Sequence, residues 1–374
     1  MKILLLKIAV GCLNIIYFFI KWLPTKNKIT FISRQGNTIS FDFCILSQQL
    51  KKDLKGFKII VLTKRLTQED GIIAKISYCL HIFTQMYHIA TSKVVILDSY
   101  CLPISVLNHK KDLKVIQMWH SVGTMKKFGY SILDKKEGSN YQIAKALKMH
   151  YNYDYVFCAS EAYKDHLAQG FHIDPSKIVI YPLPRLDMLR DKKYKKDISF
   201  QIYERYPDLK KKKTILYAPT FRKNKDITPA VEKLINQVDF EKYNFIVKLH
   251  PLDQTVIEDE RVIIDNTFSS FDMLLVSDYI ISDYSCFIYE AAFLEKPIFL
   301  YNFDLDHYMN SRDTYIDYNK DIPLFKSKDP KVIIKAIEEC KYDISTVCEF
   351  KKKYIKESKQ SYSKNISNFI KQLL

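Results

Sequence analysis

One histidine stands where a short apolar run meets a basic turn. In "QMWHSVGTMKKFGY", residues 117–130, His120 ends the apolar run, and Lys126 and Lys127 follow shortly after it. A neutral imidazole can take the proton of a hydroxyl nucleophile near physiological pH. Gly123 permits a tight turn beside the histidine, and the two lysines could attract an anion there. We therefore expect His120 to act as a general base, with Lys126 and Lys127 near a phosphate or an acceptor.

A second histidine, His250, follows another apolar run in "VKLHP". On local sequence alone it is either a structural donor or a catalytic group, and both interpretations stay open. The sequence contains no HExxH, GxSxG, Walker A or GxGxxG motif and no metal-spaced cluster of Asp and His. Metalloprotease, lipase, P-loop and hydride-transfer chemistry therefore have no support, and we expect neither a metal nor a cofactor.

The stretch "ISDYSCFIYEAAFLEKP", residues 281–297, combines an apolar strand with a helix start. The strand would end at Ser282 and Asp283, and Ser285 could cap the helix that follows. The free N–H groups and the positive dipole end of such a helix suit a phosphate. The alternative is an ordinary helix cap with no ligand.

Short apolar runs alternate with helical patterns from residue 28 onward, which indicates an α/β fold. In open α/β sheets the ligand crevice lies beyond the carboxyl ends of the strands. Many polar residues occur at such positions, and they fall into two series along the chain. They are Arg34, His120, Arg185, Thr220, Arg222, His250, Asp283 and Ser285. The two series predict two facing crevice walls.

The same pattern predicts the domain organisation. A charged, lysine-rich stretch at 191–213 separates the two series of strands and indicates a connection with some helix in it. We expect four parts. They are a membrane-associating helix at 1–24, a first α/β domain at 25–195, a second α/β domain at 196–345, and a closing helix at 346–374 that packs back across the domains.

Charge and cysteine usage restrict the partners and the compartment. The chain of 374 residues has 58 Lys and Arg against 42 Asp and Glu, a formal net charge of +16. This excess predicts an anionic partner: nucleic acid, an acidic lipid surface or a phosphate-bearing substrate. A basic binding protein without catalysis would explain the charge but not the series of strand-end residues. The eight cysteines form no CxxC pair, which favours a reducing compartment.

The N-terminal stretch "ILLLKIAVGCLNIIYFFIKWLP" has about the length of a bilayer-spanning helix, yet it contains Lys7 and Asn14. These two residues and the flanking Lys21 and Trp22 favour a helix lying in the membrane surface, with a single span as the alternative. No small-residue cleavage site follows, so a removed signal peptide is least favoured. Residues 71–92 also have helical apolar spacing, from either core packing or membrane contact.

Several motifs together resemble the CDP-glycerol glycerophosphotransferase family, the teichoic acid primases and polymerases. They occur in the order "QMWHSVGTMKKFG", "HYNYDYVFCASE", "PLPRLD", "ILYAPTFR", "VKLHP" and "ISDYSCFIYEAAFLEKPIFLYNFDLDHY". The resemblance implies a GT-B arrangement, in which two Rossmann-type α/β domains face a central cleft. It makes the domain at 25–195 the acceptor-side domain and the domain at 196–345 the donor-binding domain. It covers most of the chain after the apolar N-terminus.

The resemblance also implies a reaction and its residues. An acceptor hydroxyl attacks the β-phosphorus of CDP-glycerol and releases CMP, with His120 as the base and His250 as a second essential histidine at the phosphates. The residues implied at the donor site are Arg185, Thr220, Arg222, Ser282, Asp283, Ser285 and Glu290.

The implied partners are CDP-glycerol or CDP-ribitol and a lipid-linked saccharide or polymer. The implied place is the anionic cytoplasmic face of the cell membrane, in teichoic acid or capsule synthesis, with no nucleic acid partner. The alternatives are a CDP-ribitol-using transferase and a GT-B sugar-nucleotide glycosyltransferase, which would need the same phosphate-binding helix.

Overall fold

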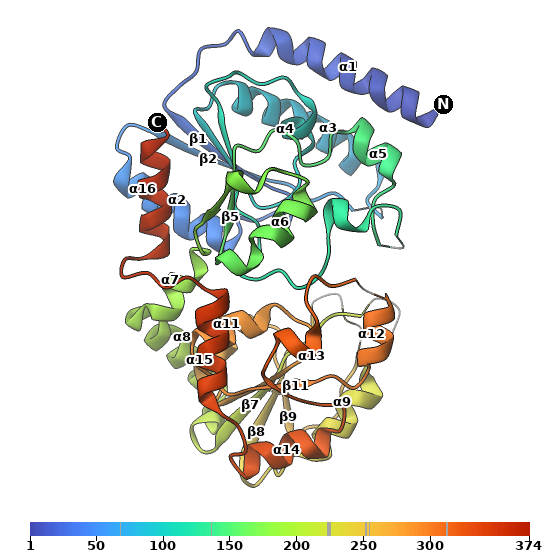
Figure 1. Ribbon diagram of the computed structural model, residues 1–374. Helices are drawn as coiled ribbons and strands as arrows, with labels where there is room; N and C mark the ends of the chain where they lie inside the picture. The colour runs from blue at the N-terminus through green and yellow to red at the C-terminus, as the bar shows by residue number, and fades with distance from the viewer. Residues whose placement is uncertain (68, 136, 223–225, 251–252, 254, 312) are drawn as a thin grey trace. The chain divides into compact units, whose positions relative to one another are not determined.

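The computed structural model describes residues 1–67, 69–135, 137–222, 226–250, 253, 255–311 and 313–374 (Figure 1). They form two compact units. Unit 1 combines Met1–Asp187 with Lys356–Leu374, and unit 2 is Met188–Ile355. The chain therefore passes between the units at Asp187, within α7 (Arg185–Arg190), whereas the sequence predicted a boundary at residue 195.

Unit 1 contains a six-stranded parallel sheet in the order β2-β1-β3-β4-β5-β6. The strands are β1 (Lys28–Ser33), β2 (Lys58–Thr63), β3 (Val94–Leu97), β4 (Lys114–Gln117), β5 (Tyr155–Cys158) and β6 (Ile178–Ile180). Every residue of β1 and β3 is buried, which is typical of parallel strands covered on both faces. The strand order reverses between β1 and β3, where an α/β sheet opens a crevice.

The helices of unit 1 connect these strands and cover the sheet. They are α1 (Lys2–Ile20), α2 (Phe41–Asp53), α3 (Ile72–Ala90), α4 (Leu102–Val106), α5 (Tyr141–Ala146), α6 (Lys164–Phe171) and α16 (Tyr362–Gln372), with 3-10 turns at Gly129–Ile132, Glu161–Tyr163 and Pro175–Lys177. Ser40 and Asn140 cap the starts of α2 and α5 by accepting backbone N–H bonds.

The C-terminal helix α16 completes unit 1 by packing beside α2 (Figure 1). The carboxylate of Asp53, at the end of α2, accepts bonds from Lys364 Nζ at 2.7 Å and Ser367 Oγ at 2.8 Å. Asp187 accepts the backbone N–H groups of Tyr362 and Ser363 at the helix start. The predicted closing segment is thus two helices, since α15 (Ile344–Tyr354) belongs to unit 2.

Unit 2 contains a second six-stranded parallel sheet, in the order β12-β11-β10-β7-β8-β9. The strands are β7 (Lys213–Tyr217), β8 (Tyr243–Val247), β9 (Val262–Ile264), β10 (Tyr279–Ser282), β11 (Ile298–Tyr301) and β12 (Phe325–Ser327). This is the Rossmann order, and it reverses between β7 and β10. The predicted α/β fold is confirmed for both units, and β12 is a strand that the sequence did not predict.

The helices of unit 2 are short apart from α8. They are α8 (Lys192–Arg205), α9 (Thr228–Ile235), α10 (Ser270–Met273), α11 (Phe287–Phe293), α12 (Leu305–Ser311), α13 (Tyr318–Asp321), α14 (Pro330–Glu338) and α15, with 3-10 turns at Pro207–Lys210 and Leu274–Val276. The stretch 191–213, predicted as a connection, is mostly α8 and the first of these turns. Its polar pattern suits a surface helix, in which only Ile202 is buried among the described residues.

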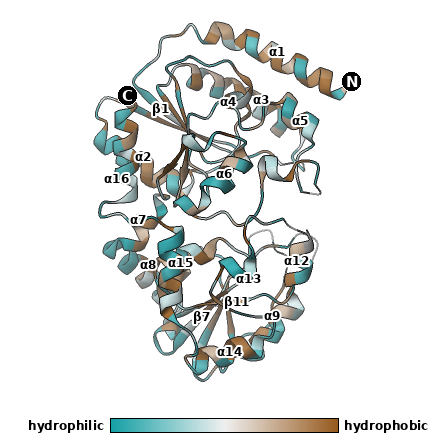
Figure 2. Ribbon diagram, in the orientation of Figure 1, coloured by the Kyte–Doolittle hydropathy of each residue, from teal (hydrophilic) through white to brown (hydrophobic). Residues whose placement is uncertain are grey.

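The apolar helix α1 contacts α3 and α5 of the same unit on one side, and most of its residues are exposed (Figure 2). Asn14 Nδ2 donates to the carbonyl of Val106 at 2.9 Å, and the hydroxyl of Tyr17 lies 3.0 Å from His109 Nδ1. Among the described residues, α1 is the one helix whose length and composition would allow a membrane span. A signal sequence near the N-terminus has the same length and composition.

Candidate functional site

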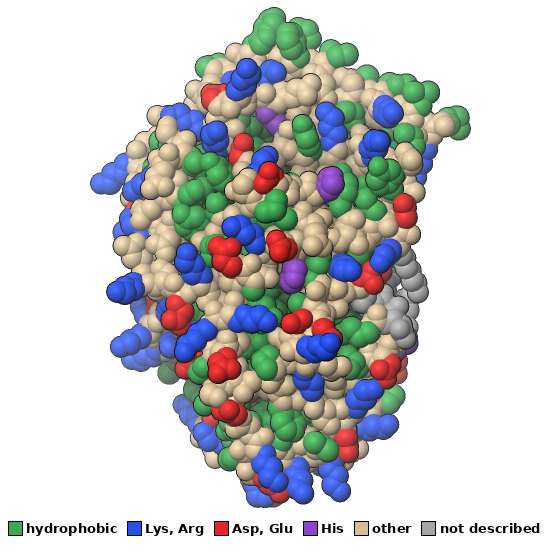
Figure 3. Space-filling view, viewed as in Figure 1, with side chains coloured by type: hydrophobic (Ala, Val, Ile, Leu, Met, Phe, Trp, Pro, Cys, Tyr) green, Lys and Arg blue, Asp and Glu red, His purple; other side chains and the backbone are tan. Residues whose placement is uncertain are grey.

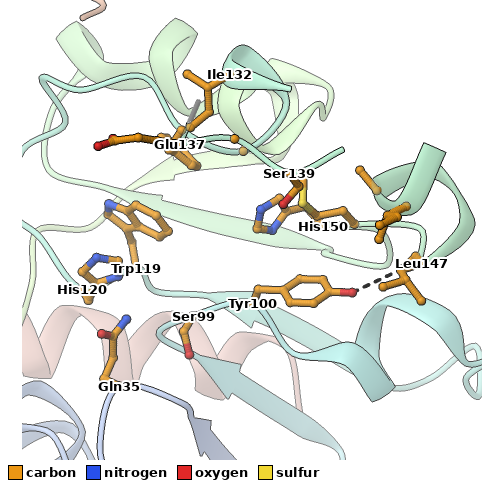
Figure 4. Close-up of a pocket in the computed structure, with 16 residues that line it drawn as sticks. Gln35, Ser99, Tyr100, Trp119, His120, Ile132, Glu137, Ser139, Leu147 and His150 are labelled. Carbon is orange, nitrogen blue, oxygen red and sulfur yellow. Dashed lines mark hydrogen bonds between the residues drawn. The ribbon is translucent and has the colours of Figure 1, made fainter. Parts of the chain in front are cut away.

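Unit 1 has a cavity of about 400 Å³ at the carboxyl edge of its sheet (Figure 4). Gln35, which follows β1, and Ser99 and Tyr100, which follow β3, line it together with Trp119 and His120, which follow β4. Strands β1 and β3 flank the point where the strand order reverses, and β4 is the next strand beyond β3. The cavity therefore occupies the position at which α/β sheets bind ligands.

His120 is exposed at this cavity, and its tautomer is set by the backbone. Its Nδ1 lies 3.1 Å from the carbonyl oxygen of Asp98. Because a carbonyl only accepts, Nδ1 carries the proton, and the neutral ring keeps its lone pair on Nε2. Desolvation by the surrounding protein lowers the pKa of His120, because it disfavours the charged ring. The hydrogen bond to the carbonyl of Asp98 raises this pKa, and the positive charge of Arg185 lowers it. The neutral, proton-accepting ring is thus favoured.

The residue before the base holds an uncommon backbone conformation. Trp119 has φ of 65°, in the left-handed region that bulky residues rarely adopt. Its N–H donates to Gln117 Oε1 at 3.0 Å, and its ring centroid lies 4.2 Å from that of His120 and 4.6 Å from that of Phe128. Figure 4 shows the two rings of Trp119 and His120 close together. Packing and hydrogen bonding therefore fix the loop that carries His120.

Arg185 lies beside the base and is held by Asp42 of α2. Arg185 Nε and its backbone N–H each donate to the Asp42 carboxylate at 2.8 Å, and Nη2 donates to the carbonyl of His120 at 3.2 Å. The Arg185 guanidinium thus links the backbone of the His120 loop to Asp42 of α2. Its predicted donor-binding role stays a prediction.

The two predicted lysines, Lys126 and Lys127, are half-buried, and the lining of the cavity includes neither. Gly129, two residues later, does line it and has φ of 56°. A Cβ on Gly129 would come within 2.2 Å of the carbonyl oxygen of Gly170 in α6. Only glycine therefore allows this wall to lie so close to α6.

Sequence reasoning missed other residues of the cavity. Ser99 and Tyr100 follow β3 by two and three residues, and Gln35 follows β1 by two, so the strand-end rule could have found all three. His150 also lines the cavity and has φ of 62°, although its local sequence has no distinctive setting. No local signal identifies such a residue, because its position depends on the fold of the whole unit.

In unit 2, Thr220 and Asp283 meet where the strand order reverses. Thr220 follows β7, Asp283 follows β10, and both the N–H and the Oγ1 of Thr220 donate to Asp283 Oδ1, at 2.8 and 2.6 Å. The two strands are neighbours in the sheet although about 60 residues separate them. The structure thus brings together two of the predicted donor-site residues.

Arg222 lies between two carboxylates in the interior of unit 2. Its Nη2 donates to Asp283 at 2.7 Å, and its Nε donates to Asp304 at 2.8 Å. Its side chain is 4% exposed and packs among the rings of Tyr284, Phe303 and Tyr308. Burial lowers the pKa of Arg222, but the two carboxylates outweigh it and raise the pKa above its usual value. In this arrangement Arg222 stabilises the loops around Asp283.

The other predicted donor residues lie in and around β10 and α11. Ser282 is fully buried and donates to the carbonyl of Ala218 at 2.8 Å, and Glu290 is 6% exposed on α11. The N-cap of α11 is Cys286 rather than the predicted Ser285, whose Oγ accepts the N–H of Phe287 at 3.2 Å from one residue earlier. His250 is exposed after β8 and stacks on Phe221, with ring centroids 5.1 Å apart.

Among the described residues, no group of three His, Cys, Asp or Glu side chains is placed to hold a metal ion. The chemistry that the described residues themselves offer is that of an acid–base group at the edge of unit 1 and a polar strand-end cluster at the edge of unit 2. These are the parts expected for a group transfer to a hydroxyl.

Known proteins resemble this chain over nearly its whole length. It is 31% identical to the teichoic acid ribitol-phosphate primase of Bacillus spizizenii, covering 100% of this chain and 99% of that protein. It is 30% identical to the teichoic acid glycerol-phosphate primase of Bacillus subtilis, covering 97% and 96%.

Solved structures share the fold at lower identity. The wall teichoic acid polymerase TagF superposes with a TM-score of 0.73 at 17% identity, covering 99% of this chain and 96% of that one. The UDP-GlcNAc 2-epimerase of Methanocaldococcus jannaschii superposes with a TM-score of 0.57 at 12% identity, covering 92% and 99%. At these identities the likeness concerns the fold alone.

The family described as CDP-Glycerol:Poly(glycerophosphate) glycerophosphotransferase matches residues 15–372. This agrees with the resemblance carried by the motifs around His120, Thr220 and Asp283. The chain belongs to this glycerophosphotransferase family and is a CDP-alcohol phosphotransferase of teichoic acid synthesis.

Proposed function

We propose that this protein transfers glycerol phosphate from CDP-glycerol to a hydroxyl of a membrane-linked saccharide or polymer and releases CMP. The observation that carries the proposal is the geometry of His120. Its Nδ1 proton is engaged by Asp98, its Nε2 lone pair is free to accept a proton, and it lines a cavity at the sheet edge of unit 1. This is the arrangement that a general base for a hydroxyl requires.

In the proposed step, His120 Nε2 takes the proton of the acceptor hydroxyl. The oxygen then bonds to the β-phosphorus of the donor, and the bond from that phosphorus to the oxygen of CMP breaks, with its electron pair leaving on CMP. The product is a phosphodiester. Positioning and stabilisation of the phosphoryl charge supply much of the rate in such transfers.

For the donor, the supporting residues are those at the sheet edge of unit 2. Thr220 and Asp283 meet where the strand order reverses, which is the usual nucleotide position in a Rossmann unit. His250 is exposed after the neighbouring strand β8 and could hold a phosphate oxygen when protonated. The side chains of Arg222, Ser282 and Glu290 are buried. They would therefore position the loops of the donor site rather than contact the donor.

CDP-ribitol is a second candidate donor. The observation favouring it is the 31% identity to a ribitol-phosphate primase, beside 30% to a glycerol-phosphate primase, each over nearly the whole chain. The purified protein should release CMP from one of these donors when a lipid-linked acceptor is added. Product length, read by mass spectrometry, then separates a single addition from a polymer. Comparing teichoic acid and capsular acceptors in the same assay separates the two acceptor classes.

The same assay tests the glycosyltransferase alternative. Nucleotide sugars replace the CDP-polyols, and release of the nucleotide is followed with the same acceptors. Transfer from a nucleotide sugar, with no CMP release from either CDP-polyol, would overturn the proposal.

We also propose that unit 1 rests on the anionic cytoplasmic face of the membrane through α1 and α3. Hydrophobic side chains gather along the edge of the molecule over α1 (Figure 3). The helix α3, which contacts α1, exposes further large apolar side chains, among them Ile72, Ile73 and Leu80. Exposed apolar side chains gathered in this way are typical of a surface that contacts a membrane or another protein.

The hydrogen bonds of Asn14 to Val106 and of Tyr17 to His109 support a helix that lies in the membrane surface, because a helix spanning the membrane would lose them. The protein should float with vesicles containing phosphatidylglycerol and be released by alkaline carbonate. Resistance to carbonate would assign α1 as a span, and absence from the vesicle fraction would contradict membrane contact.

A further inference from the structure

A second, larger cavity in unit 1 is strongly basic. This groove has a volume of about 740 Å³, and five lysines line it: Lys110, Lys111, Lys145, Lys148 and Lys177. None of them forms an ion pair with a carboxylate among the residues that the structure describes. Two carboxylates also line the groove, but Asp154 accepts the N–H of Val115 and Asp174 accepts the N–H of Ser176, each at 2.8 Å.

The positive charge of the groove comes from the lysines rather than from its buried histidines. Burial lowers the pKa of His109 and of His150 to about 4, so both rings are neutral at physiological pH. Lys110 and Lys177 donate to backbone or hydroxyl oxygens. Lys111, Lys145 and Lys148 are exposed, and their ammonium groups can bind an anion without giving up an ion pair.

The groove connects two places that matter for a lipid-linked substrate. Toward α1, its residue His109 contacts Tyr17, and Lys110 Nζ donates to the carbonyl of Leu23 just after that helix. Toward the other cavity, it shares Met149 and His150 with the lining beside His120. An anion held by the lysines would therefore lie between the apolar helix and the proposed base.

Hydrogen bonds also join the groove to the loop of the base. Gln117 Nε2 donates to the hydroxyl of Tyr153 at 3.3 Å, so the proton of that hydroxyl is available to His150 Nδ1, 3.0 Å away. Gln117 Oε1 accepts the N–H of Trp119. A ligand that orders His150 thus acts on the residue next to His120.

We propose that this basic groove binds the phosphate or diphosphate that links the acceptor's lipid to its saccharide, with the saccharide directed toward His120. The inference rests on the proposed function and adds to it a site that binds the lipid-linked acceptor. A phosphate esterified at both ends carries one negative charge and a diphosphate carries two, so the three available ammonium groups can neutralise either linkage. Its lipid end would lie near α1, and its hydroxyl end would reach the neighbouring cavity.

The test is the charge-reversing double variant Lys145→Glu/Lys148→Glu, with Lys111→Glu as an independent single variant. The matched control is Lys52→Glu/Lys55→Glu, which makes the same change of net charge at exposed lysines outside the groove. Each protein is assayed with one saccharide carried either by a short-chain prenyl diphosphate or by an uncharged alkyl group.

We expect the double variant to raise KM for the diphosphate-linked acceptor about tenfold or more, since one charge-assisted hydrogen bond corresponds to roughly this factor. Lys111→Glu should raise the same KM. KM for the alkyl-linked acceptor and for the CDP-polyol should stay unchanged, as should all constants of the control. An equal effect on both acceptors, an equal effect of the control, or no effect would overturn the proposal.

Two further arms separate other outcomes. Binding to phosphatidylglycerol vesicles should be unchanged in the double variant. If vesicle binding falls while KM for the short-chain acceptor is unchanged, the lysines bind lipid headgroups and the proposal is wrong. Titration with geranyl diphosphate tests the groove without turnover. Weaker binding by the double variant would support the site even if no CDP-polyol is used, and equal binding would overturn it.

Discussion

The imidazole of His120 and the backbone carbonyl of Asp98 form a 3.1 Å contact that ties the loop after β4 to the end of β3. Because the partner is a carbonyl, the contact selects one tautomer without a second titrating group. Asp98 itself is buried, and burial raises the pKa of its carboxyl group. The proton-accepting nitrogen of His120 is therefore set by the sheet rather than by a charged neighbour.

Replacing the base should remove turnover and leave the fold intact. His120→Ala is expected to lower kcat for CMP release about 100- to 10,000-fold, the usual contribution of a general base. Its melting temperature should change little, because the side chain is exposed. His307→Ala removes an exposed histidine of α12 and serves as the control. Turnover retained by His120→Ala would rule out the assigned base.

The pH dependence should respond in opposite directions to the two charges beside His120. Only the neutral ring accepts a proton, so kcat/KM rises with pH through the pKa of His120, which lies below its usual 6.5. Arg185 lowers this pKa and Asp42 raises it. Arg185→Gln should move the acidic limb to higher pH and Asp42→Asn to lower pH. Shifts of the same sign would contradict this account, since they would indicate a merely structural effect.

The interior of unit 2 should be sensitive to loss of the Arg222 guanidinium. Arg222→Met leaves Asp283 and Asp304 buried together without a cation, which typically costs about 3–5 kcal/mol. The control, Arg261→Met, breaks an ion pair with Asp259 whose arginine is 55% exposed, and it should cost much less stability because solvent screens the exposed pair. Thermal unfolding measures both. Equal losses of unfolding free energy in the two variants would show that the buried ion pairs of Arg222 stabilise the protein no more than an exposed pair does.

Docking of α16 should depend on the ionised carboxylate of Asp53. Burial raises its pKa, but bonds from Lys364, Gln49 and Ser367 outweigh this and hold the pKa well below its usual range. The stabilisation is therefore complete well above the unfolded value of 3.8 and is lost as the pH falls toward the lower folded pKa. Asp53→Asn should lose about 1–3 kcal/mol at pH 7.

Hydrogen exchange of the α16 amides measures this loss. The difference between Asp53→Asn and the native protein should shrink as the pH falls below about 4, because the Asp53 carboxylate of the undocked state then binds a proton and favours undocking. The docked carboxylate is protonated only at still lower pH. Asp112→Asn changes an exposed aspartate of the same unit and should leave the exchange of α16 unchanged. Unaltered protection of α16 in Asp53→Asn would contradict the role of this pair.

The sequence predicted what depends on local pattern. His120 was found because it ends an apolar run, and the alternation of runs predicted eleven of the strands. Burial and pairing over long separations could not be predicted in this way. Arg222 follows a strand like any loop residue, but its partner Asp304 lies 82 residues later. Arg185 likewise pairs with Asp42 across 143 positions, and no single window of sequence contains both.

The interrupted course of unit 1 has a consequence for synthesis on the ribosome. Unit 2 is one continuous segment, Met188–Ile355, so it can fold as soon as its last residues have emerged. Unit 1 begins first, but the polar and apolar groups of α2 that α16 covers stay open until residues 362–372 have been made. Unit 1 is therefore the first unit to be translated and the last to be completed, and unit 2 can already be folded on the nascent chain when α16 is made.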